Sequence, residues 1–227
     1  MAMQMLWLHW RTVRMGLLPL ALAAFGLPLL VVQQMESRTY LTGLESAAYF
    51  LSVGEAFLPL FPGLAATIGF TLALTAWSWD HRVGHVYALS LPVSRARYAL
   101  LKFGAGALLA LVPVACLLLG AFMAQATVDL PDGLRAYPLQ LGARFLFAVL
   151  LLYALLFAMA AGTIRTTVIV VSAWIAIPLL YTLGLDSLGQ GHPLVQRLPD
   201  WEQIYEAVLV GFGPFRILAG NWMFVDA

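Results

Sequence analysis

Five long apolar runs limit what this chain can fold into more than any other feature. The runs cover residues 15–32, 56–77, 103–126, 145–161 and 168–185. A helix needs about 20 mostly apolar residues to cross the hydrocarbon core of a bilayer, and each run comes close to that length. Because backbone polar groups must not be left unpaired in lipid, we expect the runs to be helical. They predict an all-α polytopic membrane protein, with five transmembrane helices in a single transmembrane domain.

The composition excludes an ordinary soluble domain. The 227 residues are 62% hydrophobic and only 10% charged, and their mean hydropathy is +0.89. A soluble domain carries about 25% charged residues. The single cysteine, Cys116, lies in the middle of the third run, which excludes a disulfide or a cysteine-based metal site within the chain. We therefore expect a multi-pass protein of the inner or plasma membrane, surrounded by the lipid bilayer.

The segment before the first run has the pattern of a short helix in the membrane interface. Residues 1–14 carry apolar side chains at helical spacing, among them Trp7 and Trp10, together with Arg11 and Arg14. Such residues are enriched at the level of the lipid headgroups. The alternative is that this segment extends the first span into the cytoplasm. A cleavable signal peptide fits less well, because the first run is about 18 residues long rather than 7–15 and no small-residue cleavage site follows it.

The distribution of charge predicts a cytoplasmic N-terminus. With that orientation the inner segments hold seven basic residues and a single acid, Asp80. The outer segments hold five basic residues and ten acids. Four of the seven inner basic residues fall within residues 79–102, and basic residues near the ends of spans favour the cytoplasmic side.

Residues 186–227 are expected to lie on the outer side, because five spans from an inner start end there. They contain one short apolar stretch, 207–212, which is bounded by Glu206 and Gly213 and is too short to span. We expect an interfacial or re-entrant helix in this segment. Two alternatives stay open at this end of the chain: the protein has five spans, or a sixth span follows Ala227.

A polar loop, residues 80–98, interrupts the apolar runs on the predicted inner side. Its first half carries apolar residues at the spacing of one face of a short helix, namely Val83, Val86, Tyr87 and Leu91. Pro92 favours an extended residue before it and ends that helix. Ser94 is placed to cap the next helix, which is expected to continue into the third span. A short helix held at a fixed angle to a membrane helix can transmit force between a soluble partner and the bilayer.

In these residues the chain resembles the permease subunits of type-2 ABC exporters. In that family a coupling helix joins the second and third spans. Its loop contains an acid and a base, then a glycine and leucines, a Leu-Pro-Val-Ser-Arg-like turn and a lysine. The matching residues here are Asp80, Arg82, Gly84, Leu89, Leu91, Pro92, Val93, Ser94, Arg95 and Lys102. The sequence departs from the family pattern at Asp80, where glutamate is usual, and it does not contain the sixth span with which the family normally ends.

The resemblance implies a membrane-spanning permease subunit of an ATP-driven transporter, with export as its direction. It implies a soluble ABC ATPase subunit docked on the loop and a second permease chain, identical or different, that shares the translocation path. The implied contacts with the ATPase subunit are Asp80, Arg82, Gly84, Val86, Tyr87, Leu91, Pro92, Ser94 and Arg95. Because the sequence has no Gly-x-x-x-x-Gly-Lys-[Ser/Thr] phosphate loop, we expect ATP and Mg²⁺ on the partner subunit and no enzyme activity in this chain.

Two weaker patterns have more than one interpretation. Thr67, Thr71 and Thr75 repeat every four residues in the second run, which suits either helix packing or a translocation path or subunit interface. His81 and His85 have the spacing of two metal ligands on a helix. The glutamate of the metalloprotease pattern is absent between them, which favours a basic, partner-facing surface.

Two other classes of function stay open. A non-catalytic membrane assembly or regulatory protein has the same composition, and only the identity of its partner distinguishes it. An integral membrane enzyme or an ion-coupled carrier usually needs ionisable groups within its spans. The predicted spans contain no Asp, Glu, Lys or Arg, which argues against both. Nothing in the sequence indicates a nucleic-acid partner.

Overall fold

The structure, a computed structural model, describes most of residues 2–161 and a smaller part of the remainder. The described residues are 2–36, 49, 57, 59–82, 94–130, 134–161, 168–169, 172, 176, 179–181, 213–218, 222 and 225–226. The chain divides into two compact units, of which the first is Met1–Phe157 together with Asn221–Ala227 and the second is Ala158–Gly220.

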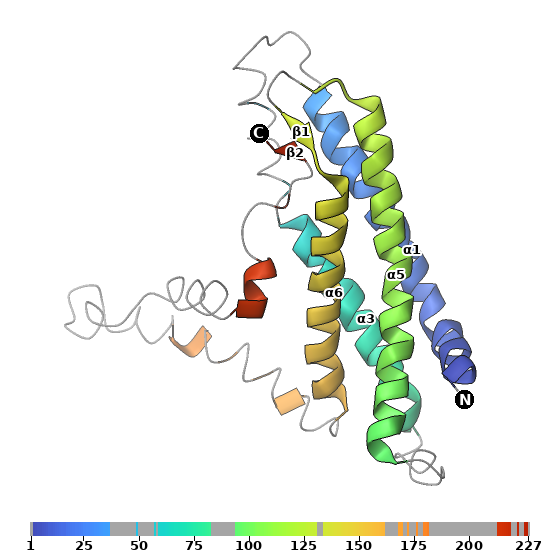
Figure 1. The fold of residues 1–227 in the computed structure, drawn as a ribbon. Helices are drawn as coiled ribbons and strands as arrows, with labels where there is room; N and C mark the ends of the chain where they lie inside the picture. Colours follow the sequence, from blue (N-terminus) through green and yellow to red (C-terminus); the bar gives the residue numbers. More distant parts are fainter. Residues whose placement is uncertain are drawn as a thin grey trace, which may run out of the picture. The chain divides into compact units, whose positions relative to one another are not determined.

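Four long helices run side by side in the first unit (Figure 1). They are α1 (Ala2–Glu36), α3 (Leu60–Arg82), α5 (Arg95–Thr127) and α6 (Pro138–Ala160), the last of which ends in the second unit. Each of the four is long and apolar enough to cross a membrane. The predicted helical, membrane-like character of the chain is therefore confirmed. The fifth predicted span, residues 168–185, lies largely outside the described residues.

Three of the four helices, α1, α5 and α6, begin well before the apolar runs that predicted them. α1 and α5 have 35 and 33 residues, or about 50 Å each, whereas the hydrocarbon core of a bilayer is about 30 Å thick. α5 begins at Arg95 rather than 103, and α6 begins at Pro138 rather than 145. The apolar pattern stops where charge begins, but the backbone hydrogen bonds of a helix continue past that point. Lys102 and Arg144 consequently lie within helices.

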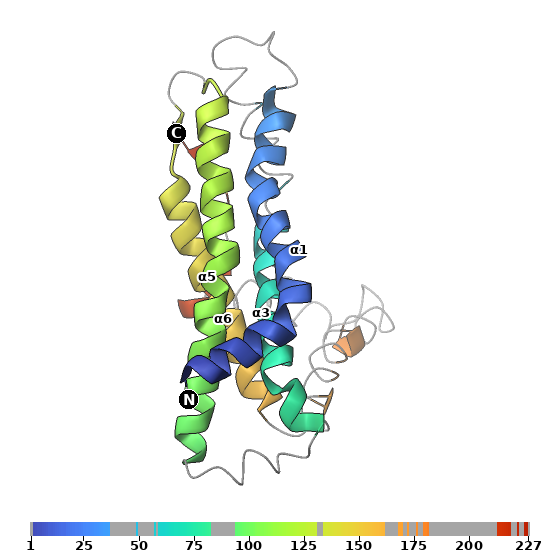
Figure 2. The same cartoon turned by 90° about the vertical axis from the view of Figure 1, so that its right-hand side faces the viewer.

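α1 is one continuous helix that changes direction in its N-terminal part (Figure 2). Pro19 accounts for the bend, because proline removes a helical hydrogen bond and its ring clashes with the preceding turn. The helix predicted over residues 1–14 is thus the N-terminal section of α1 and not a separate element. Its outer face carries Met3 and Trp7, which are 79% and 60% exposed, whereas His9 is buried. A position of this section in the membrane interface stays a prediction.

Glycines bring the helices of the bundle into close contact. A Cβ atom at Gly120 of α5 would lie 2.9 Å from the carbonyl carbon of Phe25 in α1. One at Gly69 of α3 would lie 2.9 Å from the backbone nitrogen of Tyr153 in α6. A side chain does not fit at these distances from backbone atoms, so both crossings depend on glycine. Close approach at small residues is typical of packing between membrane helices.

The C-terminal residues return to the first unit. Val225–Asp226 (β2) pairs antiparallel with Arg135–Ala136 (β1). Trp222 is 1% exposed and stacks on Phe61 of α3, with ring centroids 6.4 Å apart. The Arg144 guanidinium lies 4.4 Å from the centre of the Trp222 ring. Part of the predicted outer segment is therefore anchored to the helix bundle.

The second unit contains a short 3₁₀ helix, η1 (Gly213–Leu218). The interfacial or re-entrant helix predicted around residues 207–212 lies outside the described residues.

Candidate functional site

The candidate site is the base of the predicted coupling loop, where α3 ends and α5 begins. α3 ends at Arg82 and α5 starts at Arg95. The predicted loop of residues 80–98 therefore includes the last residues of α3 and the first residues of α5. The connection between them is residues 83–93, which lie outside the described residues. Five of the predicted contact residues fall there: Gly84, Val86, Tyr87, Leu91 and Pro92.

Ser94 caps α5 as its sequence position predicts. Its backbone is extended, with φ −62° and ψ 144°, and its hydroxyl accepts a hydrogen bond from the Arg97 backbone N–H at 3.4 Å. This bond satisfies one of the donors that a helix leaves unpaired at its N-terminus. The cap fixes where α5 begins, and it leaves Arg95 exposed at the helix start. Arg82 is likewise exposed at the end of α3.

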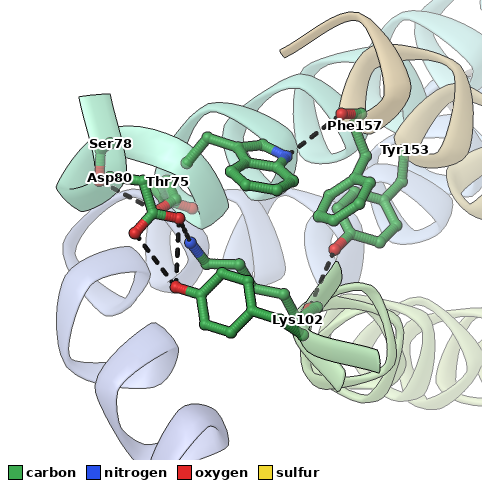
Figure 3. Close-up of polar contacts among 8 residues, drawn as sticks. Thr75, Ser78, Asp80, Lys102, Tyr153 and Phe157 are labelled. Atoms are coloured by element: carbon green, nitrogen blue, oxygen red, sulfur yellow. Dashed lines mark hydrogen bonds and ion pairs between the residues drawn. The ribbon is translucent and has the colours of Figure 1, made fainter. Parts of the chain in front are cut away.

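Asp80 is buried and faces the interior of the bundle. It is 0% exposed, and its carboxylate accepts hydrogen bonds from the Tyr98 hydroxyl at 3.1 and 3.2 Å (Figure 3). The same carboxylate forms an ion pair with the Lys102 ammonium. The predicted contact of Asp80 with an ATPase subunit stays a prediction; in the described part of the chain its side chain joins α3 to α5. The physical reason is that a carboxylate inside a bundle needs a cation and hydrogen-bond donors, and α5 supplies both.

Two aromatic rings complete the surroundings of Lys102. Its ammonium lies 4.5 Å from the centre of the Trp77 ring and 5.1 Å from that of the Tyr98 ring. A cation over aromatic faces is stabilised by about 2 kcal/mol when it is removed from water, and the Lys102 side chain is only 13% exposed. We refer to Asp80, Tyr98, Lys102 and Trp77 as the polar clamp.

The polar clamp also reaches α6. The indole N–H of Trp77 donates to the Phe157 carbonyl at 3.2 Å, and the two rings are in contact, with centroids 5.1 Å apart. The Tyr153 hydroxyl lies 3.5 Å from the Lys102 carbonyl of α5 (Figure 3). It also donates to the Phe103 carbonyl at 3.3 Å, and its ring stacks on the Phe103 ring with centroids 5.0 Å apart. The ends of α3, α5 and α6 near the loop are thus held together by buried polar and aromatic contacts.

A cavity of about 190 Å³ adjoins the polar clamp between α1, α3 and α5. His9 of α1 lies on its wall, and its Nε2 atom is 3.2 Å from the Thr75 hydroxyl of α3. The other ring nitrogen, Nδ1, is buried and has no hydrogen-bond partner in the described part of the chain. The wall of the cavity carries both apolar and polar side chains, which come from the ends of three helices.

The three threonines of the second run have different surroundings. Each hydroxyl donates to the carbonyl four residues earlier, at 2.7 to 2.8 Å. Thr71 lies against α1, where a Cβ atom at Gly16 would be 3.2 Å from its methyl group, and Thr75 contacts His9. Thr67 is exposed. Thr71 and Thr75 thus contact α1, and a role of the three threonines in a translocation path or subunit interface stays a prediction.

The chemistry of the polar clamp is structural. Its carboxylate, hydroxyl and ammonium bind one another, and all three are buried or nearly so. Within the described ranges, no three His, Cys, Asp or Glu side chains come together in a way that could hold a metal ion. The pair His81 and His85 is not tested by this, because the side chain of His81 and all of His85 lie outside the described residues.

The sequence alone does not indicate that His9, Trp77 or Tyr98 belongs to the site. Tyr98 and Lys102 lie 18 and 22 residues from Asp80, on the far side of the loop. One signal was present: a lone acid at the end of an apolar run, followed by a tyrosine and a lysine one turn apart on the next helix. His9 offered no comparable signal, because its partner Thr75 is 66 residues away.

No family model matches this chain, and no curated protein or solved structure matches it either.

Proposed function

We propose that this chain is the membrane-spanning permease subunit of an ATP-driven transporter of the type-2 ABC exporter kind. In this proposal the loop between α3 and α5 docks on a separate ATPase subunit that binds ATP and Mg²⁺. The permease chain contributes the membrane path and the mechanical link, and it does not hydrolyse ATP. Its N-terminus and the loop face the cytoplasm.

The observation that carries the proposal is the polar clamp at the base of the loop. A soluble subunit can move membrane helices through a loop only if the two ends of the loop move together. Asp80 lies two residues before the end of α3, and Tyr98 and Lys102 lie in the first two turns of α5. Their buried contacts fasten the two helix ends to each other. This arrangement supports a force-bearing loop, whereas a loop that only connects two spans needs no buried ion pair at its base.

Further contacts extend the link to the other two helices. The contact between His9 and Thr75 joins α3 to α1, and the hydrogen bond from Trp77 to Phe157 joins α3 to α6. A push on the loop would then displace the loop-side ends of all four helices as one body. Such a displacement fits alternating access, in which two permease chains rock against each other.

The packing within the bundle supports a path between two chains and not through one. At Gly120 and Gly69 the backbones of neighbouring helices are in contact, which leaves no room for a substrate at these crossings. The second permease chain, identical or different, would supply the other wall. The exposed faces of the bundle are apolar, so the proposed path suits lipids, polysaccharides, peptides or drugs with an apolar part.

Purification of the chain from its native membrane in mild detergent tests the proposal. We expect an ATPase subunit to co-purify in stoichiometric amount. Arg95→Glu, at the loop, should strongly reduce that amount, and where the complex survives it should uncouple ATP hydrolysis from transport. Arg135→Glu makes the same charge change beyond the far end of α5, at another exposed arginine, and should retain the partner.

Two results would count against the permease assignment. If Arg95→Glu retains the ATPase subunit and couples normally, the loop is not the docking site. If wild-type protein purifies with a partner that lacks a phosphate loop, the alternative of a non-catalytic membrane assembly or regulatory protein is favoured.

A further inference from the structure

An apolar groove of about 630 Å³ lies on the lipid-accessible side of the bundle, outside the cavity at the polar clamp. Its walls come from the N-terminal section of α1, from α5 and from α6, and include Met3, Leu101, Gly104, Leu108 and Leu150. The bend in α1 creates the groove, because it carries the first turns of α1 across α5 (Figure 2).

The length of the groove corresponds to one leaflet of a bilayer. On α5 it extends from Leu100 to Leu111, which is about 16 Å along the helix axis. Half of a hydrocarbon core about 30 Å thick is about 15 Å. Both leucines are well exposed, at 69% and 46%. A groove that ran across the whole membrane would suit a helix of a partner, whereas one of this depth suits an acyl chain that enters from one surface.

A basic side chain stands at the end of the groove nearest the polar loop. Arg97 is exposed and lies three and four residues before Leu100 and Leu101, on the same face of α5. On α1, the Arg11 guanidinium lies 5.6 Å from the centre of the Trp7 ring, which is 60% exposed, in the same helix section as the groove residues Met3 and Leu6. Exposed tryptophan and arginine are typical of the headgroup level of a membrane. No described acid forms an ion pair with Arg97.

We propose that this groove binds one anionic phospholipid, with an acyl chain between α1, α5 and α6 and the phosphate group beside Arg97. The site lies in the leaflet next to the polar loop. A bound acyl chain would fill the space beneath the bend of α1 and support it against α5. The inference does not depend on the identity of the soluble partner, since it rests only on the groove and the charge of Arg97 beside it.

Gly104 offers a direct way to block the groove. It lines the groove, and a Cβ atom at this position would meet no atom within 4 Å. Gly104→Phe therefore places a ring in the groove with no clash at its Cβ atom, and removal of a helical glycine does not weaken the helix. Gly63→Phe is the matched control, because Gly63 of α3 is also open, is exposed and lies outside the groove.

Native mass spectrometry of the purified protein, together with any subunits that accompany it, measures the binding. The detergent-solubilised protein is titrated with phosphatidylglycerol or phosphatidylcholine of the same acyl chains. We expect one tightly bound phosphatidylglycerol on the wild type and on Gly63→Phe, and about tenfold weaker binding or less on Gly104→Phe. Arg97→Gln should reduce the preference for phosphatidylglycerol over phosphatidylcholine by about fivefold and leave acyl-chain binding in place.

Equal binding of phosphatidylglycerol to Gly104→Phe and to the wild type would overturn the proposal. A second outcome would also overturn it: if Gly104→Phe leaves lipid binding unchanged but lowers the fraction of dimer, the groove is an interface between copies of this chain. Thermal unfolding of both phenylalanine variants checks that they fold, so that a loss of lipid is not mistaken for a loss of structure.

Discussion

Removal of Lys102 alone should destabilise the protein far more than removal of both members of its ion pair. Lys102→Met leaves the Asp80 carboxylate buried, at 1% side-chain exposure, with only the Tyr98 hydroxyl as a hydrogen-bond donor among the described residues. The double variant Asp80→Asn with Lys102→Met removes both charges and leaves an amide oxygen that can still accept from Tyr98. The comparison separates a buried ion pair from two independent surface charges.

The size of the expected loss in the free energy of unfolding follows from the burial of the ion pair. Breaking a buried ion pair by removal of one partner costs about 3–5 kcal/mol, because an uncompensated charge stays out of water. Replacement of both partners by neutral groups of similar size is often close to neutral. For a chain of 227 residues, a loss of 3–5 kcal/mol lowers the midpoint of thermal unfolding by about 6–20 °C. We expect the double variant to lose no more than about 2 kcal/mol, because its loss is limited to the ring contacts of the ammonium.

Thermal unfolding followed by tryptophan fluorescence in one mild detergent is the assay for all variants. Arg82→Met is the control for loss of a positive charge, because Arg82 is exposed and its replacement should change stability by less than about 0.5 kcal/mol. If Lys102→Met is as stable as Arg82→Met, or if the double variant is as unstable as Lys102→Met, the contacts at the loop base do not form a coupled ion pair.

Three further predictions concern contacts elsewhere in the bundle, each measured as a shift in the same thermal assay or, for the tryptophan variant, by circular dichroism. Gly120→Ala should lower the free energy of unfolding by about 1–3 kcal/mol, because its methyl group meets the α1 backbone. Gly63→Ala should raise the free energy of unfolding by up to about 1 kcal/mol, and equal shifts of the two variants would refute the close crossing. Trp222→Ala should lower the free energy of unfolding by about 3–5 kcal/mol. A change below about 1 kcal/mol would show that the C-terminal residues are not packed on α3. Thr75→Val should lower the free energy of unfolding by about 1–3 kcal/mol, because it removes the hydroxyl that contacts the Nε2 atom of buried His9. Thr67→Val, at an exposed position, should lower it much less.

The predictions from sequence succeed where the interaction is local. Four of the five apolar runs coincide with helices, and the cap at Ser94 forms as its position before α5 indicates. Hydropathy and capping depend on residues within one or two turns of each other, so the sequence displays them directly. The bounds are less accurate, because a helix such as α5 continues through charged residues that end an apolar run.

The predictions are weakest where the contact joins distant parts of the chain. The sequence predicts Asp80 as an exposed acid of the loop, whereas in the structure it is buried because Tyr98 and Lys102 of another helix bind it. The bend at Pro19 places His9 beside Thr75, and no pattern near either residue indicates that contact. Both cases involve a polar side chain that is buried only because a second helix supplies its partner.

Photo-crosslinking from the loop is the most direct test of whether the loop docks on an ATPase subunit. A photoreactive amino acid in place of Tyr87 is illuminated in native membranes, and the crosslinked protein is identified by mass spectrometry. The same amino acid in place of Thr67, which is exposed in the middle of α3, is the control. We expect position 87 to crosslink to a protein with a phosphate loop of the Walker type, and we expect no such crosslink from position 67. A crosslink from position 87 only to lipid, or to a protein without such a loop, would contradict it.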